Sequence, residues 1–131
     1  MDSKLKDIIT KSTFQIIPGV FVYTKVAEFP KSKGHFLITQ DEDEITVVTK
    51  ESKLDELSVL ERNKDDYALI ALNVSIPFYC VGFLAAVSRA VADSGANILI
   101  VSTYSKDYIM VQTEHKEVAR EVLLDLGFKQ E

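Results

Sequence analysis

The second half of the chain has the clearer alternation of apolar and polar positions, and it predicts a strand followed by a helix. Residues 67–74 form an apolar run of strand length after the charged turn at 63–66. Pro77 ends this strand, because proline lacks an N–H and pushes the residue before it toward an extended conformation. Apolar side chains at spacings of three and four then predict a helix over 81–94, and Gly95 suits the left-handed residue that closes it.

Two more β-rich runs and a second helix follow in the same half. The runs at 97–104 and 108–112 are separated by three polar residues, a spacing that is typical of an antiparallel hairpin. An apolar stripe over 118–126 predicts the helix, which Gly127 ends. Residues 67–128 therefore follow the order β-α-β-β-α, a ferredoxin-like unit that lacks its last strand, and we expect that strand to come from elsewhere.

The first half of the chain has the pattern of a reduced copy of the second. Strand-like residues at 36–39 and 45–49 flank an acidic tip and predict another hairpin. A shift of 64 positions places 45–49 on 109–113, and it places the amphipathic segment 54–60 on the helical segment 118–124. Both halves are therefore expected to end in a helix.

This comparison predicts two domains of unequal completeness. The short segment 27–34 stands where the second half has the helix 81–94. Residues 1–64 would then form a degenerate half that lacks its first helix, and residues 65–131 would form the fuller domain. Exact identities between the halves are few, so a coincidence between two ordinary hairpins is the alternative.

Composition and charge exclude several classes of function. Fifteen Lys and Arg against 20 Asp and Glu give a net charge of −5, so no positive field attracts a nucleic acid. The longest apolar runs reach about half of the ~20 residues that a membrane span needs, and the charges at 1–7 precede no apolar signal segment. We therefore expect a cytoplasmic protein with neither nucleic acid nor membrane as a partner.

Few residues in this chain could carry out chemistry. Cys80 is the single cysteine, and its possible soft co-ligands, His35 and His115, are both distant in sequence. No motif ties a serine or cysteine to His115, so no pair of nucleophile and base is visible. We therefore expect no metal site, no cofactor and no catalytic activity.

Three segments, at 75–78, 82–85 and 100–111, resemble ACT-domain proteins. More narrowly, the chain is similar to small tandem-ACT proteins related to the regulatory region of aspartate kinases and to the CASTOR arginine sensors. The most specific part is the string Ser-Thr-Tyr-x-x-Asp-Tyr-Ile-x-Val that begins at Ser102. The resemblance implies an α+β fold of ferredoxin-like βαββαβ domains, each an antiparallel sheet with helices on one face, with the first copy degenerate.

The resemblance also implies where a ligand would bind. In ACT domains an amino acid or similar effector lies between two modules, against the loop after the first strand and the start of the following helix. Amides at a helix start attract a carboxylate, and the Asp107 carboxylate could pair with an ammonium or guanidinium group of the ligand. The candidate ligand-binding residues are Ser75, Ile76, Pro77, Phe78, Gly82, Ser102, Thr103 and Asp107.

Each candidate also has a structural interpretation. Ile76 to Phe78 could simply end a strand, and Gly82 could serve helix packing. Ser102 and Thr103 could bond the local backbone of the hairpin, and Asp107 could belong to its turn.

The sequence thus predicts a non-enzymatic regulatory protein. It would bind a small molecule, an amino acid in particular, and form a homodimer or a higher homo-oligomer, because edge strands and a helix that is apolar nearly all round need to be covered. The alternative is a structural dimerisation module that binds no ligand.

Overall fold

The computed structural model describes residues 1–74 and 80–131, which form two compact units. The first unit combines Met1–Ile17 with Ala68–Glu131, and the second is Pro18–Tyr67. This division differs from the expected 1–64 and 65–131, because the first residues of the chain pack with the C-terminal ones. Among the described residues, no helix is long and apolar enough to cross a membrane.

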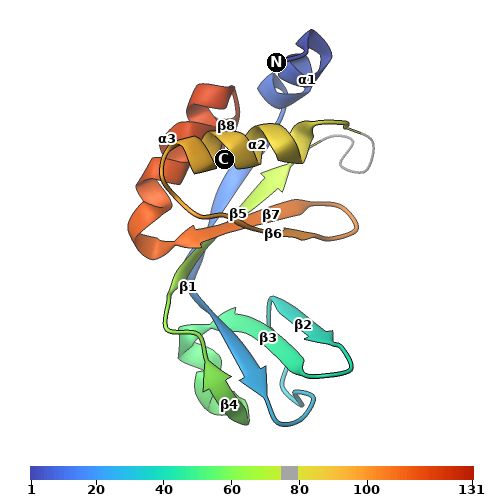
Figure 1. The fold of residues 1–131 in the computed structure, drawn as a ribbon, viewed down its shortest axis with the longest axis vertical. Coiled ribbons are helices and arrows are strands. Elements are labelled where there is room, and N and C mark those ends of the chain that lie inside the picture. The colour runs from blue at the N-terminus through green and yellow to red at the C-terminus, as the bar shows by residue number, and fades with distance from the viewer. Residues whose placement is uncertain (75–79) are drawn as a thin grey trace. The chain divides into compact units, whose positions relative to one another are not determined.

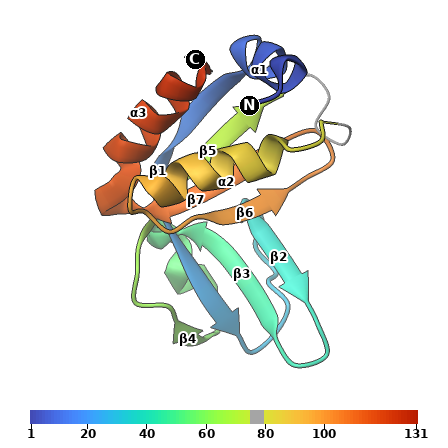
Figure 2. The same cartoon turned by 45° about the horizontal axis from the view of Figure 1, so that its top comes forward.

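Among its described residues, the first unit contains three α-helices and a set of strands. Its elements are α1 (Ser3–Thr10), the start of β1 (Thr13–Val26), β5 (Tyr67–Asn73), α2 (Phe83–Asp93), β6 (Leu99–Ser102), β7 (Asp107–Gln112), the 3-10 helix η2 (Thr113–His115), α3 (Lys116–Leu126) and β8 (Lys129–Gln130). From β5 onward the order is βαββαβ, which confirms the α+β ferredoxin-like prediction. The strands lie in the order β1-β5-β7-β6, and α2 and α3 lie on one face of them (Figures 1 and 2).

The prediction that the last strand is missing from this part of the chain is wrong. Two residues of β8 supply it, and they pair in parallel with Thr13 and Phe14 of β1. The N–H of Lys129 donates to the Ser12 carbonyl at 3.1 Å, and that of Glu131 donates to the Phe14 carbonyl at 2.9 Å. The start of β1 lies between β8 and β5, so a segment distant in sequence adds a further strand to the sheet.

The core of the first unit lies between its sheet and its helices. Alternate residues of β5 (Ala68, Ile70, Leu72) face this core, as the period of two in a strand requires. The other buried members are Leu5, Ile9, Phe14, Val74, Phe83, Val87, Val91, Ala96, Ile109, Val111, Ala119, Leu123 and Phe128. Three elements distant in sequence meet in one aromatic group, in which the Phe128 ring lies 6.4 Å from Phe14 and 5.9 Å from Phe83, edge to face.

Two glycines end the helices of this unit as predicted. Gly95 has a φ of +92° and follows α2, and Gly127 has a φ of +117° and follows α3. Beyond Gly127 the chain folds back, so that the Phe128 N–H donates to the Leu123 carbonyl at 3.1 Å. This hydrogen bond and the burial of the Phe128 side chain are typical of a Schellman cap.

The second unit is a small antiparallel sheet. Its elements are the rest of β1, β2 (Leu37–Gln40), β3 (Ile45–Lys50), the 3-10 helix η1 (Glu51–Glu56) and β4 (Val59–Arg62). The strand order is β2-β3-β1-β4, and the predicted hairpin is confirmed by the pairing of β2 with β3. The predicted helix over 54–60 is wrong, because η1 ends at Glu56 and the apolar residues that follow it enter β4.

A loop before β2 is tied to this sheet through His35. The ring nitrogen Nε2 of His35 lies 2.8 Å from Ser32 Oγ, and Nδ1 lies 2.8 Å from Thr49 Oγ1 on β3. Lys53 Nζ also donates to the Lys33 carbonyl at 3.1 Å. No α-helix occurs within Pro18–Tyr67, all of which the structure describes.

The buried Phe14 provides a test of the first unit. Replacing it with alanine should reduce the free energy of unfolding by about 3–5 kcal/mol, because a cavity is left between β1 and Phe128. Urea unfolding followed by circular dichroism measures this change. Gln15→Ala, at the exposed neighbouring position, is the matched control. Equal midpoints for the two variants would contradict the packing of β1 in this core.

Candidate functional site

The predicted site residues fall on two described segments of the first unit, the start of α2 and the β6–β7 hairpin. Ser75, Ile76, Pro77 and Phe78 lie outside the described residues, and their predicted role stays a prediction. Gly82, Ser102, Thr103 and Asp107 can be examined directly.

Gly82 begins helix α2 in a left-handed conformation, with φ +86° and ψ −4°. A Cβ at this position would meet only Leu5, at an ordinary 3.5 Å, so the backbone angle rather than crowding favours glycine. The Gly82 carbonyl accepts the Ala86 N–H at 2.9 Å, and the Phe83 N–H donates to Cys80 at 3.3 Å.

The next two amides of α2 belong to its first turn, before the repeating hydrogen bonds of the helix. Within the part of the chain that the structure describes, the N–H groups of Leu84 and Ala85 have no acceptor. The first helical turn carries no acidic residue. Such a helix start favours a negatively charged group through its open donors and through the helix dipole.

A pocket of about 190 Å³ lies beside this helix start. Its walls come from α1 and from the residues before Gly82: Asp2, Lys4, Leu5, Ile8, Cys80 and Val81. Burial raises the pKa of the Cys80 thiol, which disfavours the reactive thiolate. The pocket therefore offers an ammonium group, a carboxylate and an apolar floor, without an activated nucleophile.

The hairpin residues engage one another. Ser102 and Asp107 are directly opposite in the pairing of β6 with β7, and Ser102 Oγ donates to Asp107 Oδ1 at 2.6 Å. Asp107 is only 4% exposed. Thr103 donates to the Lys106 carbonyl from its backbone N–H at 2.8 Å and from its hydroxyl at 3.1 Å. These contacts support the structural interpretation of the three residues, as closure of the hairpin.

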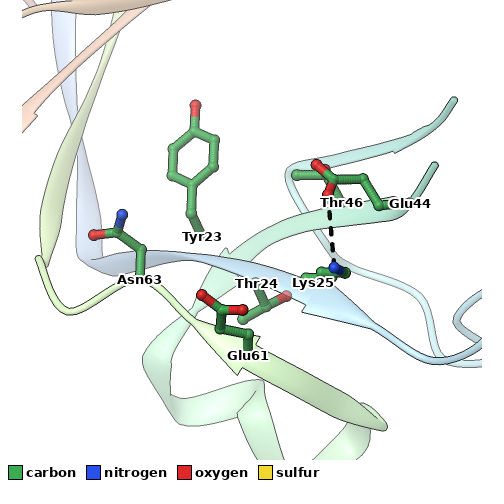
Figure 3. A pocket seen from close by; sticks show the side chains of 7 residues that line it. All are labelled: Tyr23, Thr24, Lys25, Glu44, Thr46, Glu61 and Asn63. Atoms are coloured by element: carbon green, nitrogen blue, oxygen red, sulfur yellow. Dashed lines mark ion pairs between the residues drawn. The ribbon is translucent and has the colours of Figure 1, made fainter.

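A second pocket, of about 270 Å³, lies in the second unit and was not predicted. Its lining residues lie on β1, β3 and β4 or next to the ends of these strands. They are Tyr23, Thr24, Lys25, Glu44, Thr46, Glu61 and Asn63 (Figure 3). Lys25 is directly opposite Thr46 on one side and Glu61 on the other. No local pattern indicated this face, because it forms only when residues 59–62 pair with β1.

Tyr23 forms a wall of this pocket. Its ring packs edge to face against Tyr67, with the ring centroids 5.7 Å apart, and the Asn63 N–H donates to its carbonyl at 3.0 Å. Burial, and to a lesser degree the neighbouring Tyr67, raises the pKa of the Tyr23 phenol above its usual 10.0. The phenol is therefore neutral at physiological pH and can donate a hydrogen bond.

Among the described residues, no group of three or more His, Cys, Asp or Glu side chains could hold a metal ion. The acidic hairpin tip is closed by Asp41, whose carboxylate accepts the N–H groups of Asp43 and Glu44 at 2.8 and 3.0 Å. The chemistry that the two pockets share is recognition of charged and polar groups.

One comparison with known proteins relates the C-terminal part of the chain to a family of domains. Residues 63–125 match the family model of the ACT domain. No curated protein matches the sequence.

Several solved structures have the same fold at low sequence identity. A Vibrio cholerae protein of unknown function, described as a possible transport protein, aligns with a TM-score of 0.77 and 20% identity over 95% of this chain and 96% of that chain. An Agrobacterium tumefaciens protein gives 0.69 and 20% over 92% of both chains. The ligand-free regulatory subunit of Thermus thermophilus aspartate kinase gives 0.65 and 13% over 86% of this chain and 95% of that one.

The hairpin contact between Ser102 and Asp107 can be tested directly. Ser102→Ala should lower the free energy of unfolding by about 1–3 kcal/mol, because the buried Asp107 carboxyl loses a hydrogen-bond donor. Thermal and urea unfolding measure the loss. Ser105→Ala, at an exposed position of the same hairpin, should change stability little. If both variants were equally stable, the hydrogen bond would contribute nothing and Asp107 would again be a candidate ligand contact.

Proposed function

We propose that this chain, in which residues 63–125 are an ACT domain, is a regulatory protein that binds a small molecule and has no catalytic activity of its own. We further propose that the molecule is an amino acid and that the protein acts in the cytoplasm. Similarity to regulatory subunits of aspartate kinases supports the regulatory role at the level of the fold.

The observation that carries this proposal is the open start of helix α2 beside the pocket formed with α1. A ligand carboxylate would accept from the N–H groups of Leu84 and Ala85, next to Gly82. Lys4 on the pocket wall adds a positive charge that favours the same group.

The proposed contacts of the ligand are divided between two sets of residues. We retain Ser75, Ile76, Pro77, Phe78 and Gly82 as proposed ligand contacts, on the grounds of the family resemblance and the helix start. Ser102, Thr103 and Asp107 are assigned to the hairpin, since their side chains are already engaged there.

A second candidate function is a homodimerisation module that binds no ligand. The surface between α2 and α3 supports it, because Ala90, Val122, Asp125 and Leu126 line a groove of about 230 Å³ there. Val118 and Leu124 of α3 are also 37% and 39% exposed. A homodimer through this surface is compatible with the first proposal as well, so ligand binding is what separates the two.

Ligand binding is tested with the twenty amino acids, by thermal shift and then by calorimetry. A ligand at about 100 times its dissociation constant should add about 2.7 kcal/mol to the free energy of unfolding. Lys4→Met should weaken binding, because Lys4 lines the pocket, whereas Lys6→Met on the same helix should not. If no amino acid stabilises the protein, the first proposal fails and the dimerisation module remains.

Self-association is tested by sedimentation at micromolar concentration. Ala90→Glu should convert the homodimer to a monomer, because a carboxylate would be buried in the groove between α2 and α3. Ala92→Glu, at an exposed position of α2 outside this groove, should leave the dimer intact. A monomeric wild-type protein would contradict the proposed dimer.

A further inference from the structure

We infer that the pocket on β1, β3 and β4 of the second unit is a separate binding site for a small zwitterion, one ammonium and one carboxylate a few bonds apart. This inference goes beyond the proposed function, which concerns the start of α2 in the first unit. It rests on the charges, the unpaired polar groups and the size of the pocket (Figure 3).

The charges of the pocket alternate across its three strands. Lys25 lies between Glu44 and Glu61, and its Nζ is 3.9 Å from Glu44 Oε1. This separation is at the outer limit of an ion pair, and both side chains are more than 40% exposed, so the pair is weak. Glu61 is directly opposite Lys25 yet makes no ion pair with any described residue. A ligand can therefore engage both charges without breaking a strong contact.

Two further polar groups in the pocket have unused hydrogen-bonding capacity. The Tyr23 hydroxyl has no hydrogen-bond partner among residues 1–74 and 80–131, while its ring is held by Tyr67. Asn63 is fixed through its backbone and through Oδ1, which accepts the Asp65 N–H at 2.9 Å. Its Nδ2 has no partner in the same described residues. Asn63 is therefore suited to orienting a ligand, whereas the Tyr23 hydroxyl is directed away from Lys25 and Glu61 (Figure 3).

The arrangement favours a zwitterion over other ligands. A simple anion would be repelled by two carboxylates, and a simple cation would leave Lys25 without a ligand charge to pair with. A zwitterion places its ammonium on Glu61 and its carboxylate on Lys25. Directly opposite residues in an antiparallel pair have Cβ atoms about 4.5–5.5 Å apart, so both side chains can reach the two ends of one small ligand. A volume of about 270 Å³ admits only a small molecule.

Calorimetry on the full chain, with β-alanine and 4-aminobutyrate as probes, tests the inference. Propionate and propylamine carry one charge each and serve as matched ligands. We expect saturable binding of at least one zwitterion at millimolar concentrations or below, and at least about tenfold weaker binding of the singly charged compounds, since each loses one charge-assisted contact.

The variants locate the binding. Glu61→Gln and Lys25→Met should each weaken zwitterion binding about tenfold or more, with the circular dichroism spectrum unchanged because both positions are exposed. Glu42→Gln and Lys64→Met are the controls, since both are exposed and neither lines this pocket. Lys4→Met, which tests the proposed site at α2, should have no effect on these probes.

Three results would overturn the inference. They are no saturable binding of either zwitterion, equal binding of the singly charged compounds, and binding that is lost in Lys4→Met but kept in Glu61→Gln. The last result would assign the zwitterion to the start of α2 and leave the proposed function standing. If none of the twenty amino acids binds but β-alanine or 4-aminobutyrate binds normally, the proposed function fails and this inference stands.

Discussion

The structure of the first unit depends on one backbone interaction, the insertion of the start of β1 between β5 and the two-residue strand β8. Helices α2 and α3 need a sheet face on which to bury their apolar sides, and β1 widens that face. It also carries Phe14 into the core, where its ring meets Phe128. The short β8 is stable because Glu131 accepts hydrogen bonds from Thr13 and Asn73 beyond its end.

Periodicity was sufficient to predict the elements with long apolar patterns. Strand β5, helices α2 and α3 and the β6–β7 hairpin follow the predicted order, and the glycines that end the helices adopt the expected conformation. Strands β4 and β8 were missed because neither has a buried face: every residue of Val59–Arg62 and Lys129–Gln130 is exposed. Their pairing with β1 is long-range and leaves no local pattern of hydrophobicity.

The candidate site was predictable only in part, for a different reason. A serine and an aspartate in a hairpin can bind a ligand or each other, and the sequence pattern alone does not distinguish these two roles. Only the register that places Ser102 opposite Asp107 distinguishes them. The pocket around Lys25 depends likewise on the pairing of β1 with β4. The open amides at the start of α2 follow from the helix boundary, which the left-handed Gly82 determines.

The first unit is discontinuous in sequence, because Pro18–Tyr67 separates Met1–Ile17 from Ala68–Glu131. The ribosome makes Phe14 early and its partner Phe128 near the end of these residues. During translation, all strands of the second unit are therefore made before the first unit is complete. The N-terminal segment cannot pair with β5 and β8 until those strands have been made. Until residue 128 has been made, Phe14 therefore lacks its aromatic partner in the core.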